Sequence, residues 1–213
     1  MEQLNVLRRE AASGAPRLLV VLCHGVGADA QDLIGLAEPW AAGLPELAFM
    51  AVDAPEPYDM APYGRQWFSL QDRTPSVLDA GARRATPPLM ATVDAELSRL
   101  GLAAGDVALM GFSQGAMMVL HAGLRRAVPP AAILAYSGAL LDSPALDTEI
   151  TGRPPVLLVH GEDDEVVPFA RGPAAAEALR RRHVPVTTVW RKGVGHWVDE
   201  GGLQAGVDLL ARL

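Results

Sequence analysis

The chain has 213 residues, of which 50% are hydrophobic and 20% are charged, and its formal net charge is -7 at pH 7. This composition is that of a globular enzyme rather than of a disordered chain, and the acidic balance argues against a surface that binds nucleic acid. The length suits one compact core, so we expect residues 1–213 to form a single domain.

Neither an export signal nor a membrane span is expected. The first residues include an acidic side chain, Glu2, and lack an unbroken apolar stretch of signal-peptide length. The longest strand-like apolar run, Leu18 to Cys23, is far below the roughly 20 residues that cross a bilayer. Cys23 is the one cysteine, so no intramolecular disulfide can form. These features predict a cytoplasmic protein.

Short runs rich in Val, Leu and Ile alternate with segments of helical spacing. A weakly marked antiparallel edge strand is predicted at residues 4–9. Buried strands are predicted at 17–23, 47–52, 107–111, 131–136, 155–160 and 186–190, and helices at 29–42, 88–100, 114–127, 169–183 and 202–213. Such alternation is typical of an α/β fold with a mostly parallel sheet and helices on both faces. Two stretches crowded with Pro, Gly and polar residues, 54–70 and 71–87, are predicted to be long loops.

The most informative segment is an apolar strand that runs into Gly111-Phe-Ser113-Gln-Gly115 and then into a helix-forming run. A Gly-x-Ser-x-Gly pattern in this context is typical of a nucleophile elbow. The two glycines leave room for a sharp turn at Ser113, and the helix N-terminus directs backbone N–H groups toward an oxyanion. The alternative is a packing turn without chemistry, which the flanking strand and helix disfavour.

A serine nucleophile needs a histidine to accept its proton and a carboxylate to orient that histidine. In this type of fold the order along the chain is serine, acid, histidine. Of the five histidines, His196 lies in a Gly-rich loop between the last strand and the last helix, and it is the predicted base. We expect activity to rise with pH as it loses its proton. The other four are expected to be structural: His24, His121, His183, and His160, which should support the loop that follows it.

The acid is expected after the strand at 155–160, where Glu162, Asp163, Asp164 and Glu165 stand in a row. Periodicity does not distinguish among these four carboxylates. A cation site is the alternative, but matching ligands are missing elsewhere in the sequence. The pattern therefore predicts one carboxylate facing His196, with no metal and no organic cofactor.

With these segments in place, the chain resembles the phospholipase/carboxylesterase family of small α/β-hydrolases, which includes the acyl-protein thioesterases. The matching motifs span nearly the whole chain: Cys23-His-Gly-Val-Gly-Ala-Asp29, Gln66-Trp-Phe68, Gly111-Phe-Ser-Gln-Gly115, His160-Gly-Glu-Asp-Asp-Glu-Val-Val-Pro168 and Gly195-His196. The resemblance implies an α/β-hydrolase fold without a separate lid domain. It also implies that the family's triad acid, the aspartate of His-Gly-x-x-Asp-x-Val-Val-Pro, is Asp164.

The same resemblance implies further site residues. The backbone N–H groups of Val26 and Gln114 would form the oxyanion hole. The aromatic loop, which contains Tyr63, Trp67 and Phe68, is expected to bind the acyl group, as the resemblance implies for the Trp-Phe pair, and packing of this loop on the core is an equal alternative. Two departures from the family pattern stand out: Ser69 replaces a frequent acidic residue, which bears on the acyl pocket, and Ala116 replaces a frequent glycine.

The expected function is hydrolysis of carboxylic ester or thioester bonds through an acyl-enzyme intermediate. The alternatives are a lysophospholipase or acyl-protein thioesterase that uses the same serine, and a non-catalytic protein of the same fold that binds a ligand. Ser113, Asp164 and His196 together argue against the last of these. The expected partners are a small ester or acyl substrate and, on family grounds, a second copy of the chain. Cys23 is expected to be a buried hydrophobe rather than a nucleophile.

Overall fold

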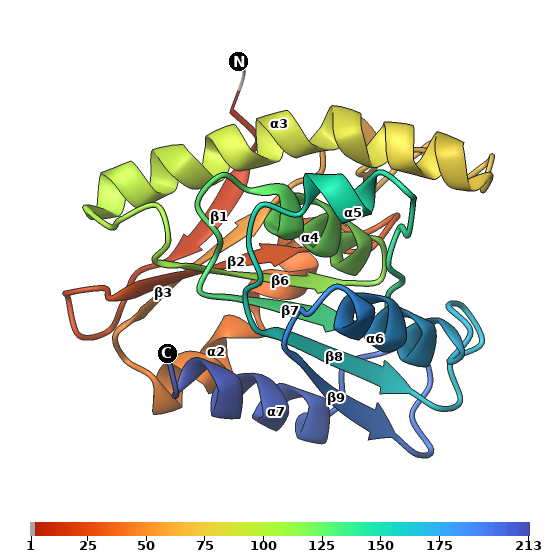
Figure 1. Cartoon of the computed structure of the whole chain (residues 1–213). Helices are drawn as coiled ribbons and strands as arrows, with labels where there is room; N and C mark the ends of the chain where they lie inside the picture. Colours follow the sequence, from red (N-terminus) through yellow and green to blue (C-terminus); the bar gives the residue numbers. More distant parts are fainter. Residues whose placement is uncertain (1–2) are drawn as a thin grey trace.

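The computed structural model describes residues 3–213, which form one seven-stranded sheet with helices on both faces (Figure 1). The strands lie in the order β1-β3-β2-β6-β7-β8-β9, and β1 alone is antiparallel to its neighbour in this sheet. The predicted mostly parallel sheet and its antiparallel edge strand are confirmed. The strands are β1 (Val6–Arg9), β2 (Leu18–Cys23), β3 (Leu47–Val52), β6 (Val107–Phe112), β7 (Ala132–Tyr136), β8 (Val156–Gly161) and β9 (Val186–Arg191).

The central strands are buried on both faces, which explains their unbroken apolar runs. In β2, Leu19 and Val21 belong to one core, whereas Val20 and Leu22 belong to the other, because alternate side chains point to opposite faces. One face is covered by α3 (Pro75–Leu100), α4 (Gln114–Arg125) and α6 (Arg171–Arg181), and the opposite face by α1 (Ala30–Ile34), α2 (Ala37–Gly43) and α7 (Glu200–Leu210) (Figure 1).

Two predictions about helices were wrong. The segment 29–42 forms two short helices, α1 and α2, because the chain turns at Gly35 and Leu36. The predicted loop at 71–87 is helical from Pro75 onward, and α3 continues through Pro87 and Pro88 in its interior. Proline removes a helical hydrogen bond, but a long buried face that packs on the core compensates for this loss.

The stretch 54–70 remains largely irregular, as predicted, apart from a short antiparallel pair. Its strands are β4 (Glu56–Pro57) and β5 (Arg65–Gln66). Between β7 and β8 the chain forms only one short helix, α5 (Leu146–Glu149). Among residues 3–213, no helix combines the length and the apolar character that crossing a membrane requires.

Candidate active site

Ser113 lies at the turn from β6 into α4, with φ 55° and ψ -117°. A positive φ is strained for any residue other than glycine, and such strain is typical of functional turns. The turn is so tight that a Cβ at Gly115 would lie 1.9 Å from the carbonyl oxygen of Cys23. A Cβ at Gly111 would lie 2.2 Å from the carbonyl oxygen of Gly115. Space therefore requires both glycines that the sequence motif contains.

His196 connects Ser113 with Asp164 through two hydrogen bonds. Its Nε2 lies 3.0 Å from Ser113 Oγ, and its Nδ1 lies 2.8 Å from Asp164 Oδ2. The side chain of Asp164 is buried, whereas Glu162, Asp163 and Glu165 are exposed. Of the four candidate carboxylates, the structure thus brings Asp164 to the histidine. A hydroxyl, an imidazole and a carboxylate in this order can transfer a proton away from the hydroxyl as it attacks a carbonyl.

Asp164 is held through both of its carboxylate oxygens. Oδ1 accepts the backbone N–H groups of Val166 and Val167, at 2.9 and 2.8 Å. Burial disfavours the charged form, but the hydrogen bonds from His196, Val167 and Val166 outweigh it, and the pKa of Asp164 is lowered. The carboxylate is therefore ionised at neutral pH, and it holds the His196 tautomer that carries its proton on Nδ1.

His160 makes a contact beyond the loop support that its sequence position predicts. Its buried Nε2 lies 2.9 Å from the carbonyl oxygen of Val167, which confirms the support of that loop. The same nitrogen lies 3.3 Å from Asp164 Oδ2. One N–H thus faces two acceptors, and the second is the oxygen that also faces His196. The only sequence signal for this contact is that His160 stands four residues before Asp164 at the end of a strand.

Two other buried histidines and the cysteine are structural. His24 Nε2 accepts the backbone N–H of Ala54 at 3.0 Å, and burial lowers its pKa. Burial and, to a lesser extent, Arg125 lower the pKa of His121 to about 4, so its ring is neutral at physiological pH. Burial raises the pKa of the Cys23 thiol, which agrees with the predicted inert role. Within residues 3–213, no three His, Cys, Asp or Glu side chains form a group that could hold a metal ion.

Val26 and Gln114, whose backbone N–H groups are the predicted oxyanion hole, both line the cavity that contains Ser113. Among the described residues, neither N–H has a hydrogen-bond acceptor. Gln114 begins α4, where first-turn amides have no partner inside the helix. Its side chain joins α4 to the aromatic loop, because Oε1 accepts the backbone N–H of Trp67 at 3.0 Å and Nε2 donates to the backbone carbonyl of Phe68 at 2.6 Å. Free amides of two residues that line one cavity with a serine hydroxyl can bind an oxyanion.

Ser113 lies between two cavities, which share Val26, Ser113 and Val166 in their walls. The first has a volume of about 330 Å³ and extends past Gln114. The second has a volume of about 450 Å³ and extends past His196. We name them the Gln114 cavity and the His196 cavity. Apolar side chains line much of the Gln114 cavity: Leu70, Leu78, Met117, Leu140, Leu141 and Val167.

The predicted aromatic trough is not found. Trp67 and Phe68 are each 1% exposed and belong to the core, whereas Tyr63 is 74% exposed, and none of the three lines either cavity. The packing alternative therefore describes Trp67 and Phe68. Ser69 also lies outside the walls of both cavities, and its hydroxyl donates a hydrogen bond to Asp59. The wall of the Gln114 cavity comes instead largely from the start of α3, the loop after β7 and the segment from β8 into α6.

Known proteins resemble this chain over most of its length. The profile of the phospholipase/carboxylesterase family matches residues 6–211. Esterase YpfH of Escherichia coli (strain K12) is 33% identical over 193 residues, which cover 90% of this chain and 81% of the relative. Acyl-protein thioesterase 1 of Schizosaccharomyces pombe is 29% identical over 175 residues, which cover 75% and 74%. The crystal structure of esterase PE8 matches with a TM-score of 0.94 at 37% identity and covers 99% of both chains.

Proposed function

Because the chain belongs to the phospholipase/carboxylesterase family, we propose that it is a serine carboxylesterase that hydrolyses ester and thioester bonds through an acyl-enzyme intermediate. The family and the α/β-hydrolase fold are as predicted. One observation carries the proposal of catalysis: the hydrogen-bonded series from Ser113 Oγ through His196 to the ionised Asp164. The two cavities that meet at Ser113 give both halves of an ester a place to lie.

The reaction has two steps. In the first, Ser113 Oγ attacks the carbonyl carbon while His196 Nε2 takes the hydroxyl proton, and the N–H groups of Val26 and Gln114 bind the oxyanion. The carbon–oxygen bond to the alcohol then breaks, and His196 gives its proton to the leaving oxygen. In the second step His196 deprotonates a water molecule that attacks the acyl carbon. The bond from that carbon to Ser113 Oγ then breaks, and His196 returns the proton to Oγ as the acid leaves. Asp164 orients the ring and stabilises its charge throughout, and remains ionised.

The two cavities have different roles in this mechanism. The leaving oxygen must come within hydrogen-bond reach of His196, which lines the His196 cavity but not the Gln114 cavity. The alcohol or thiol half of the substrate therefore lies in the His196 cavity, together with Phe112 and Trp197. The acyl half lies in the Gln114 cavity, on the side of Met117.

The proposal is tested on the wild-type chain with p-nitrophenyl esters from acetate to palmitate and with the matching thioesters. We expect turnover of the shorter members, and we expect a fluorophosphonate to abolish it while adding one adduct to the peptide that contains Ser113. The adduct is located by mass spectrometry. Turnover that favours palmitate would support the lysophospholipase or thioesterase alternative. Neither turnover nor adduct on any acyl donor would support a ligand-binding protein without catalysis.

His160 provides a separate prediction as a positioning residue for Asp164. Replacing His160 by phenylalanine removes the N–H that faces Asp164 Oδ2. We expect kcat/KM to fall about 10-fold, because a hydrogen bond to a charged group contributes about 1.5 kcal/mol. The carboxylate then attracts the charged His196 more strongly, so the acidic limb of the pH–rate profile moves to higher pH.

The matched variant is His160→Gln, whose side-chain amide keeps a donor. We expect it to restore most of the rate and the position of the acidic limb. Thermal unfolding of both variants measures any loss of packing in the loop around Val167. If the two variants lose equal activity and the acidic limb of the pH–rate profile stays at the wild-type pH in both, His160 acts only as a structural residue.

A further inference from the structure

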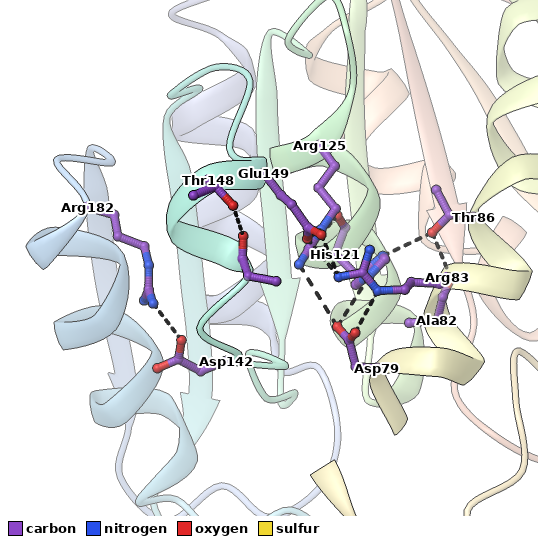
Figure 2. A network of polar contacts seen from close by, with 11 residues as sticks. Asp79, Ala82, Arg83, Thr86, His121, Arg125, Asp142, Thr148, Glu149 and Arg182 are labelled. Atoms are coloured by element: carbon purple, nitrogen blue, oxygen red, sulfur yellow. Dashed lines mark hydrogen bonds and ion pairs between the residues drawn. The ribbon is translucent and has the colours of Figure 1, made fainter. Parts of the chain in front are cut away.

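The Gln114 cavity carries four charged side chains in its wall, Arg73, Asp79, Asp142 and Arg171. The two carboxylates are bound from outside the cavity by arginines, as Figure 2 shows for Asp142 and Asp79. Arg83 Nε lies 2.7 Å from Asp79 Oδ2, and Arg182 Nη2 lies 2.9 Å from Asp142 Oδ1. Arg73 and Arg171, in contrast, form no ion pair with any of residues 3–213.

The ion-pair network behind Asp79 is balanced in charge. Arg83 and Arg125 each bind Glu149, at 2.8 and 2.7 Å, so two cations face two carboxylates (Figure 2). His121, whose Nε2 lies 3.7 Å from Asp79 Oδ1, is neutral because its pKa is about 4. The Asp79 end of the cavity therefore presents little net negative charge.

The opposite rim retains some negative charge, because Arg182 is shared between Asp142 and Asp147. Solvent and salt screen every exposed charge of this wall, Asp142 among them at 41% exposed, so the sign of the wall depends on which charged groups lack a partner. The charges left without a partner are the guanidinium groups of Arg73 and Arg171. Both are exposed at the cavity wall, one just before α3 and the other at the first residue of α6. They are local cations on a chain whose net charge is -7.

We propose that the Gln114 cavity binds acyl groups that end in a carboxylate, so that the preferred substrates are half-esters of short dicarboxylic acids. This inference rests on the proposed esterase function and on the acyl half lying in this cavity. A guanidinium group binds a carboxylate with two parallel hydrogen bonds, which makes Arg73 and Arg171 suitable partners. The anion belongs to the acyl half, because both arginines line this cavity and neither lines the His196 cavity.

The test compares two esters of equal chain length, the p-nitrophenyl half-ester of adipic acid and p-nitrophenyl hexanoate, with spontaneous hydrolysis subtracted. They differ only in a carboxylate against a methyl group at the far end of the chain. We expect the wild type to favour the half-ester by about 10-fold in kcat/KM, the effect of one charge-assisted hydrogen bond. The preference should weaken as ionic strength rises.

Three single variants, and the double variant of Arg73 and Arg171, make the test specific. Arg73→Ala and Arg171→Ala should each lower kcat/KM for the half-ester and leave hexanoate nearly unchanged. Arg180→Ala is the matched control, because Arg180 is an exposed arginine of the same helix, α6, that does not line the cavity. It should keep the wild-type ratio of the two esters.

The outcomes separate this inference from the proposed function. If hexanoate is hydrolysed without any preference for the half-ester, or if the preference survives in the double variant of Arg73 and Arg171, the inference is wrong and the esterase stands. If neither ester is hydrolysed, the proposed function itself fails, and the inference fails with it.

Discussion

Replacing Ser113 by alanine is expected to lower kcat for ester hydrolysis by about 10⁶-fold, the loss known for removing the nucleophile of a serine hydrolase. The thiol of Cys23 cannot take over the attack. Cys23 is buried, and burial raises the pKa of its thiol. Residual activity should come from the oxyanion-binding amides alone, roughly 10³-fold above the reaction in water. A continuous assay of p-nitrophenol release measures kcat of the wild type, and a long stopped assay measures the residual rate of the variant.

A serine in the same cavity provides the control for this variant. Ser143 lines the Gln114 cavity, but its Oγ has no hydrogen-bond partner among the described residues. Ser143→Ala should therefore keep kcat close to the wild-type value. If Ser113→Ala retained more than a small fraction of the wild-type rate while remaining folded, another group would be the nucleophile and the proposed mechanism would be wrong.

Replacing Asp164 by asparagine is expected to lower kcat by about 10⁴-fold while leaving the fold intact. The amide oxygen can keep the two N–H groups of Val166 and Val167, which Asp164 Oδ1 accepts. The amide nitrogen then takes the place of Oδ2 and presents N–H groups to His196 Nδ1. His196 must offer a lone pair on Nδ1 and carry its proton on Nε2, which leaves no base for Ser113.

The exposed neighbour supplies the comparison, since Asp163→Asn removes one carboxylate of the same loop without touching His196. We expect that variant to keep nearly full activity. Steady-state kinetics together with thermal unfolding distinguish a wrong tautomer from a lost fold. A loss below about 10-fold for Asp164→Asn would mean that this carboxylate does not set the tautomer of His196.

The strands could be predicted from the sequence because burial on both faces leaves an unbroken apolar run, as in β2 and β8. The start of α3 could not, since Pro75 to Pro88 has the composition of a loop, and the helix depends on contacts with the core that no local pattern encodes. The same limit applies to Trp67 and Phe68, because a Trp-Phe sequence is equally compatible with a binding trough and with a buried core.

The candidate site divides in a similar way. Ser113 and His196 follow from local motifs and chain order, whereas Asp164 could be separated from three adjacent carboxylates only through the family pattern. Arg73 and Arg171 gave no signal, because an arginine without a partner looks the same in sequence as the paired Arg83. Pairing depends on which carboxylates the fold brings near, and this is visible only in three dimensions.

The short connection from β8 to α6 has a consequence for engineering. It holds the carboxylate that faces His196 and the 62% exposed Val166 that borders both cavities, and it ends at the cavity-lining Arg171, the first residue of α6. Its two ends are anchored in the sheet and in a helix, and the turn that carries Ser113 lies elsewhere in the chain. Grafting the equal-length segment of a relative would replace Val166, which borders both cavities, and the cavity-lining Arg171 in a single step, while Ser113 and Gln114 stay in place.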